Sequence, residues 1–159
     1  MEYILLLTAC INPDGMPFTC LADVGVRKKQ YIEALNFYLK NTTRKIVFVE
    51  NSGTDISSSF KDFQHRIEFL CFDGNLCFDK RKGKEALILE YAMAKSEFIT
   101  DDVLIFKLTG RLQLININRL IHYMDKLSPS KNFVCVVPPQ NNSVDSRCFV
   151  CNKYYLENI

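Results

Sequence analysis

Two kinds of hydrophobic pattern alternate along the 159-residue chain. Short continuous apolar runs, rich in β-branched and aromatic residues, are typical of strands buried on both faces of a sheet. Between them lie segments whose apolar residues recur at the three- and four-residue spacing of amphipathic helices. Strands are predicted at residues 3–10, 46–49, 67–72, from 103 onward, 133–137 and 144–150, and helices at 27–41, 55–63, 85–95, 117–127 and from 153 onward.

Strands that alternate with helices predict an α/β fold, because each crossover helix must pack back onto a face of the sheet. We therefore expect a three-layer sandwich with a mostly parallel central sheet. The length fits a single domain spanning residues 1–159. One loop of about 15 residues, at 11–25, is long enough to be functional.

Composition narrows the classes of function. The net charge is only +2 and both signs are interspersed, which argues against a nucleic-acid partner. The seven cysteines are odd in number, several lie in apolar runs, and no signal peptide is visible, so reduced thiols and a cytoplasmic location are expected. No apolar run approaches the roughly 20 residues of a membrane span, while peripheral association with the inner face of a membrane is left open.

The strand that begins at Val103 has an unusual end. Its apolar run finishes in Lys107, Thr109, Gly110 and Arg111. In an open α/β sheet, ligands bind past the carboxyl ends of the strands. A glycine permits close approach to the backbone, and an arginine fork suits phosphate. The alternative is an ordinary turn with solvated charges.

The carboxyl ends of the other predicted strands add small residues, carboxamides and further cations. A basic loop also precedes the helix predicted at 85–95, whose dipole would favour an anion there, although such a loop is often only a solvated turn. Together, the residues at the strand ends and in this loop suit a nucleotide diphosphate. Neither GxxxxGK[ST] nor GxGxxG is present, which argues against P-loop and Rossmann sites. The contributing segments are Thr8–Pro13, Glu50–Gly53, Phe72–Asn75, Lys107–Arg111 and the basic loop with Lys80, Arg81, Lys82 and Lys84.

Six short motifs follow one another over nearly the whole chain. They are Thr8-Ala-Cys-Ile-Asn-Pro13, Arg27-x-x-x-Tyr31-x-x-x-Leu35-x-Phe37-Tyr38, Lys45-Ile-Val-Phe-Val-Glu50-Asn51-Ser52-Gly53, Lys82-Gly83-Lys84-Glu85, Lys107-x-Thr109-Gly110-Arg111 and Asp145-x-Arg147. In this order and spacing they resemble bacterial glycosyltransferases of capsule and lipopolysaccharide gene clusters, which have a GT-A-like nucleotide-sugar-binding fold.

The resemblance implies a nucleotide-sugar as donor substrate, a glycan or lipid-linked glycan as acceptor, and no separate cofactor. By position, the first motif would line the nucleotide pocket, the third would contact base or ribose, and the basic loop would lie over ribose or phosphates. The residues implied in binding are Thr8, Ala9, Asn12, Glu50, Asn51, Ser52, Lys82, Gly83, Lys84, Lys107, Thr109, Gly110 and Arg147.

GT-A domains normally carry a metal-binding acid pair after the fourth strand, where this chain has Thr109-Gly110-Arg111. We therefore expect no metal at the diphosphate, with Arg111 and Lys107 neutralising the leaving group. Inverting transfer also needs a base near the acceptor hydroxyl, for which the candidates are Asp145, Glu50 and Asp73. Asp145 and Arg147 would share a strand face, where they would also serve as a structural ion pair.

Alternatives follow from length and from weaker signals. Such transferases are generally longer than this chain, which would then be minimal, truncated, or a non-catalytic nucleotide-sugar-binding or assembly subunit. A nucleotidyltransferase would need the acid pair that is missing from the sequence. Cys148-x-x-Cys151 is a weak metal signal, because residues three apart in a strand face opposite sides. His122 is expected at the surface or packed against neighbouring residues, and the sequence does not indicate a cysteine that would form a nucleophilic Cys-His pair with it.

Overall fold

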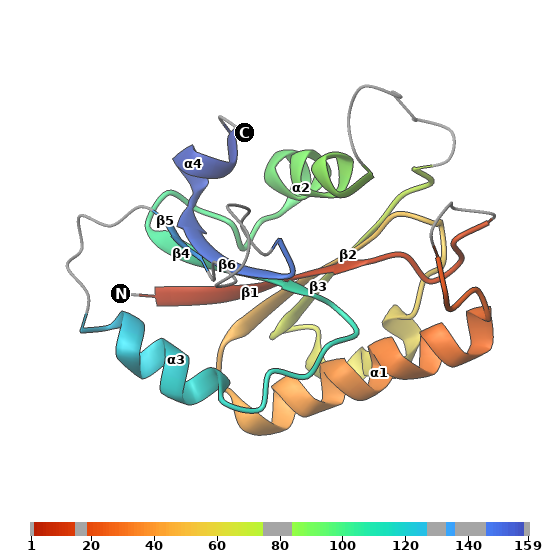
Figure 1. Cartoon of the computed structure of the whole chain (residues 1–159), viewed down its shortest axis with the longest axis horizontal. Coiled ribbons are helices and arrows are strands. Elements are labelled where there is room, and N and C mark those ends of the chain that lie inside the picture. The colour runs from red at the N-terminus through yellow and green to blue at the C-terminus, as the bar shows by residue number, and fades with distance from the viewer. Residues whose placement is uncertain (1, 15–18, 75–83, 127–132, 136–145, 158–159) are drawn as a thin grey trace.

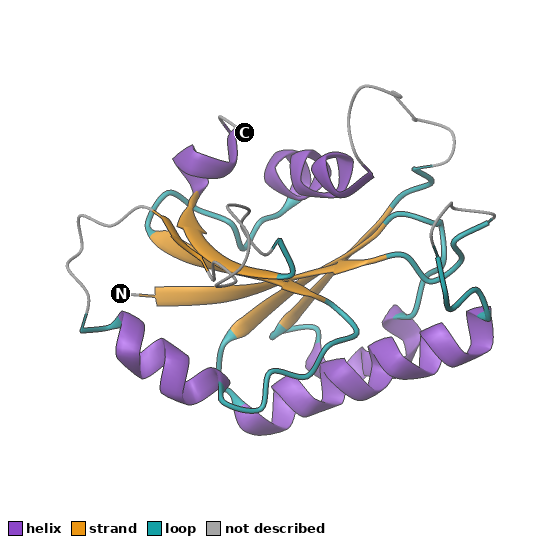
Figure 2. Cartoon of the chain, viewed as in Figure 1, coloured by secondary structure: helices purple, strands orange, loops and turns teal. Residues whose placement is uncertain are grey.

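The fold is that of a computed structural model that describes residues 2–14, 19–74, 84–126, 133–135 and 146–157 (Figure 1). These residues form a six-stranded sheet with helices on both faces, as Figure 2 shows in orange and purple. The predicted α/β class and the layered arrangement of helices about a mostly parallel sheet are confirmed.

The six strands have the order β3-β2-β1-β4-β6-β5. The pairs β1–β2, β1–β4 and β2–β3 are parallel, whereas β6 runs antiparallel to both of its neighbours, β4 and β5. The strands span β1 Glu2–Ala9, β2 Lys45–Glu50, β3 Ile67–Cys71, β4 Val103–Thr109, β5 Phe133–Cys135 and β6 Cys148–Asn152.

The helices divide between the two faces of the sheet (Figure 1). Helices α1, η1 and α3 cover one face, and α2 and α4 cover the other. Helix α1 begins three residues earlier than the hydrophobic pattern predicts, because the Asp23 carboxylate accepts a hydrogen bond from the Val26 backbone N–H at 2.7 Å. The helices span α1 Val24–Asn41, η1 Ser57–Phe63, α2 Lys84–Lys95, α3 Ile117–Met124 and α4 Lys153–Glu157.

Strand β1 lies at the centre and separates two hydrophobic cores. Tyr3, Leu5 and Leu7 pack towards α1 and α3, while Ile4 and Leu6 pack towards α2. The same alternation holds in β6: Cys148 packs against the first core and Cys151 lies in the second. The prediction that these two cysteines face opposite sides is therefore confirmed. Among the described helices, none has the length and apolarity needed to cross a membrane.

Candidate functional site

The chain reverses its direction of travel across the sheet beside β1. It passes from β1 to β2 and β3 on one side, and then returns to place β4 on the other side. Such a switch point is where open α/β sheets bind ligands, just beyond the carboxyl ends of the strands. We call the residues that follow the carboxyl ends of β1, β2, β3 and β4 the carboxyl edge.

On the β2 side, backbone groups after β1 bind directly to the segment after β2. The Asn12 N–H donates to Ser52 Oγ at 2.9 Å, and the Asn51 N–H donates to the Ala9 carbonyl at 3.1 Å. Asn12 is exposed and Ser52 is half-buried, so both can be reached from solvent. Four residues that the sequence predicted at a nucleotide site are thus brought together here.

Glu50 anchors this part of the carboxyl edge. It is 1% exposed, and its carboxylate accepts hydrogen bonds from the backbone N–H groups of Ile11, Ser52 and Thr54 at 2.8–2.9 Å. The Ser52 hydroxyl also donates to it. A carboxylate that satisfies three backbone donors fixes the two loops relative to each other. The geometry thus gives Glu50 a structural task at the edge.

Asn51 differs from its neighbour in that part of its side chain is unsatisfied. It is 4% exposed, and its Oδ1 atom has no hydrogen-bond partner among the described residues. Buried carboxamide oxygens are nearly always paired with protein, water or a ligand. Asn51 Oδ1 is thus a buried acceptor that has no hydrogen-bond partner among the described residues.

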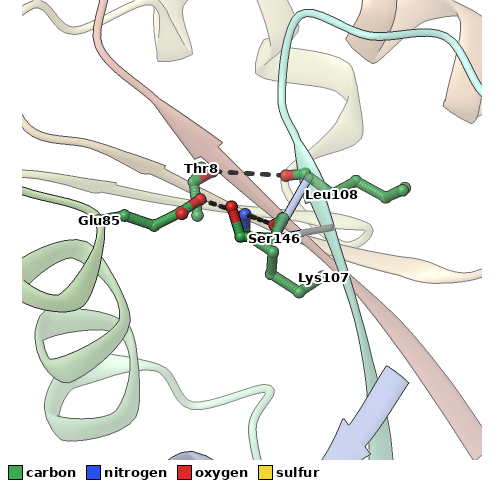
Figure 3. A network of polar contacts seen from close by, with 5 residues as sticks. All are labelled: Thr8, Glu85, Lys107, Leu108 and Ser146. Atoms are coloured by element: carbon green, nitrogen blue, oxygen red, sulfur yellow. Dashed lines mark hydrogen bonds and ion pairs between the residues drawn. The ribbon is translucent and has the colours of Figure 1, made fainter. Parts of the chain in front are cut away.

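On the β4 side, the end of β4 lies unusually close to β1. The Gly110 N–H donates to the Thr8 carbonyl at 2.8 Å, and the Thr8 hydroxyl donates to the Leu108 carbonyl at 3.5 Å (Figure 3). A Cβ atom at position 110 would lie only 2.8 Å from the Thr8 carbonyl oxygen. The glycine therefore permits close contact with β1, a packing role distinct from the expected approach of a ligand.

Arg111 follows Gly110 and is exposed. Burial raises the pKa of the nearby Tyr31 hydroxyl, and the charges of Arg27 and Arg111 partly offset that rise. Arg111 lies two residues beyond the end of β4, which is a parallel neighbour of β1.

Arg27 and Tyr31, one helical turn apart in α1, hold the backbone just after β1. The Arg27 guanidinium donates to the Cys10 carbonyl through Nε at 2.8 Å and to the Leu21 carbonyl through Nη1 at 3.1 Å, while the Tyr31 hydroxyl accepts from the Cys10 N–H at 3.0 Å. The sequence predicted a helix for both residues and placed them in one motif, but it indicated no contact with the backbone after β1. Their four-residue spacing next to the long loop was the available signal.

Lys107 lies beneath the carboxyl edge, on the α2 face of the sheet. Its side chain is 0% exposed, and its ammonium group binds the Glu85 carboxylate and the Ser146 carbonyl (Figure 3). It also lies 5.6 Å from the centre of the Phe149 ring. The expected phosphate contact is thus replaced, in the described structure, by a buried ion pair that joins β4 to the first turn of α2.

For the remaining residues predicted at the nucleotide site, the structure describes less of the surroundings. Arg147 is exposed, and its carbonyl accepts a hydrogen bond from the Thr109 N–H at 2.9 Å. Lys84 begins α2, but its side chain is outside the described set. The predicted contributions of Lys80, Arg81, Lys82, Gly83 and Asp145 fall on residues outside the described ranges.

Within the described ranges, no three His, Cys, Asp or Glu side chains gather closely enough to hold a metal ion. Comparison with protein-family models and with curated proteins finds no match to this chain. The described part of the carboxyl edge offers backbone and carboxamide hydrogen-bonding groups, hydroxyls and an exposed arginine.

Proposed function

We propose that the protein is a glycosyltransferase with a GT-A-like fold, which moves a sugar from a nucleotide-sugar to a capsule or lipopolysaccharide glycan. The observation that carries this proposal is the switch point between β1 and β4. There, Asn12, Asn51 and Ser52 lie to one side of β1, and Arg111 follows the end of β4 on the other. Switch points of α/β sheets are common nucleotide sites.

The groups at this edge suit the parts of a nucleotide-sugar. In this proposal the exposed Asn12 carboxamide meets the base or ribose, above the segment that Asn51 and Ser52 form with it. Arg111 offers a permanent positive charge to the diphosphate. In this proposal the arginine stabilises the leaving diphosphate in place of a divalent metal, and the enzyme acts in the cytoplasm, on a glycan or lipid-linked glycan at the inner face of the membrane.

Thermal-shift measurements with UDP, GDP, CMP and dTDP sugars test the donor site. We expect stabilisation by sugars of one nucleotide, and at least a tenfold loss of affinity in Arg111→Ala, because the contact is a charge-assisted one. Arg119→Ala, which removes an exposed arginine from α3, is the matched control. No stabilisation by any of the four, or unchanged affinity in Arg111→Ala, would refute this donor site.

A non-catalytic nucleotide-sugar-binding subunit is the second candidate. The engagement of the Glu50 carboxylate by backbone donors favours it, because that acid is occupied within the protein rather than held for a proton transfer. Stabilisation by a nucleotide-sugar without hydrolysis or transfer would select this candidate. Transfer that stops in excess EDTA and returns with Mg²⁺ or Mn²⁺ would refute the metal-independent mechanism.

A further inference from the structure

A cavity of about 670 Å³ lies on the α2 face of the sheet. One face of α2 lines it with Ala86, Leu89 and Met93, and β6 and α4 contribute Phe149 and Leu156. Its volume is within the range of about 300–1,000 Å³ that is typical of small-molecule sites. The wall is mainly apolar, so a ligand that fills it carries a hydrocarbon group.

One part of this cavity adjoins the carboxyl edge. Glu85 and Ser146 belong to its lining, and both bind the Lys107 ammonium group (Figure 3). Lys107 lies on β4 next to β1, and Figure 3 shows Thr8 beside the same network. A ligand with its apolar group between α2 and α4 would therefore have its other end close to the proposed donor site.

The charged groups of the lining favour a neutral ligand. Among the described residues of the lining, the charged side chains are the acids Glu85, Glu90 and Glu157, which disfavour fatty acids and phosphate esters. Glu85 is paired with Lys107, and Glu157 lies 3.9 Å from the Lys153 ammonium group, which reduces the attraction for a cation. Carboxylates accept hydrogen bonds only, so they complement the hydroxyl donors of an uncharged ligand.

We propose that this cavity binds the apolar part of a neutral, hydroxyl-rich amphiphile, of the chemistry of an alkyl glycoside, and serves as the acceptor subsite. The assignment as an acceptor subsite rests on the proposed glycosyltransferase function. The ligand class rests on the cavity alone. The two are therefore tested by separate readouts.

Intrinsic fluorescence provides the readout for the cavity, because the chain contains no tryptophan. Tyr155 lines the cavity, whereas its neighbour Tyr154 is 72% exposed and is not part of the lining. Tyr155→Trp introduces a single reporter at the site, and Tyr154→Trp is the matched control. Each variant is titrated with octyl glucoside below its micelle-forming concentration, and with methyl glucoside, octanoate and octyltrimethylammonium.

We expect a saturable blue shift with octyl glucoside in Tyr155→Trp and none in Tyr154→Trp. Binding of methyl glucoside, octanoate and octyltrimethylammonium should each be at least tenfold weaker. Adding Leu89→Glu, which places a charge on the apolar wall, should abolish the shift, while Leu87→Glu, on the same helix but outside the lining, should retain it.

Equal or tighter binding of methyl glucoside, octanoate or the ammonium probe would overturn the proposed ligand class. Thermal shift by nucleotide-sugars in the same variants separates this result from the donor site. If octyl glucoside binds and no nucleotide-sugar does, the glycosyltransferase proposal fails while the ligand class of the cavity stands. If nucleotide-sugars bind and octyl glucoside does not, the cavity inference fails alone.

Discussion

Removing either partner of the Lys107–Glu85 pair should have markedly unequal effects on stability. The Lys107 side chain is 0% exposed, whereas the Glu85 side chain is 41% exposed. Glu85→Gln leaves a positive charge buried without its carboxylate. Lys107→Met instead leaves a carboxylate that water can reach, and fills the position with an unbranched apolar side chain of similar length.

The difference in solvation sets the expected magnitudes. Leaving an uncompensated buried charge costs about 3–5 kcal/mol, and the Ser146 carbonyl and Phe149 ring that still face Lys107 place Glu85→Gln near the lower end, about 3 kcal/mol. Replacing the buried lysine by an apolar side chain should cost about 1 kcal/mol or less. For a chain of this size, 3 kcal/mol corresponds to a decrease in Tm of roughly 6–12 °C.

Urea unfolding followed by circular dichroism measures both effects, and the double variant provides the internal control. Lys107→Met combined with Glu85→Gln should regain most of the stability lost in Glu85→Gln alone, because the unpaired charge is gone. If Lys107→Met is as destabilising as Glu85→Gln, or if the double variant recovers nothing, the buried-charge reasoning is refuted.

Three further predictions concern the carboxyl edge and the core. Gly110→Ala should cost about 1–3 kcal/mol of unfolding free energy, because the added Cβ meets the Thr8 carbonyl oxygen at 2.8 Å. The control Gly25→Ala should change the unfolding free energy little, because its Cβ meets only a side-chain oxygen, at 3.3 Å. Equal effects of the two variants in urea unfolding would contradict the close approach of Gly110 to β1. Glu50→Gln should cost about 1.5–3 kcal/mol, because an amide nitrogen cannot accept from the backbone N–H groups bound by the carboxylate, while Glu33→Gln on the exposed face of α1 should be close to neutral in the same assay. Burial raises the pKa of Cys151 to about 12, above the usual value of 9.0, so the native state holds this proton more tightly than the unfolded chain does. The free energy of unfolding should therefore decline as the pH rises from about 9 towards 12. Cys151→Val should lessen that decline, and an unchanged pH dependence of stability in this variant would refute the reasoning.

The hydrophobic pattern was sufficient to predict the layers of the fold because a strand covered on both faces needs a continuous apolar run. Strand β1, buried from Tyr3 to Ala9, is the clearest case. The carboxyl ends of β1 and β2 could also be expected to meet, since parallel neighbours end at the same edge. The order of the strands was harder to predict from the sequence, because the antiparallel insertion of β6 between β4 and β5 depends on contacts between distant segments.

Individual side chains were less predictable than elements. Lys107 was expected at the ligand because it is near the end of a strand, yet alternation along β4 places it on the α2 face, where Glu85 is 22 residues away in sequence. Glu50 was expected to touch a ligand, and its carboxylate binds loop N–H groups instead, because those donors have no partner within a strand or helix. In both cases the sequence showed a charged side chain, but not the partner within the protein that binds it.

The central position of β1 has a consequence for how the chain is made in the cell. Its first neighbour, β2, emerges soon afterwards, but the hydrogen bond between Thr8 and Leu108 spans 100 residues. At about 5–20 residues per second, the second edge of β1 therefore waits on the order of 5–20 s for β4 to leave the ribosome. During that interval an apolar strand has an open edge, which is the state that favours aggregation. Yield of the folded protein should accordingly depend on chaperones that shield the nascent chain until β4 arrives.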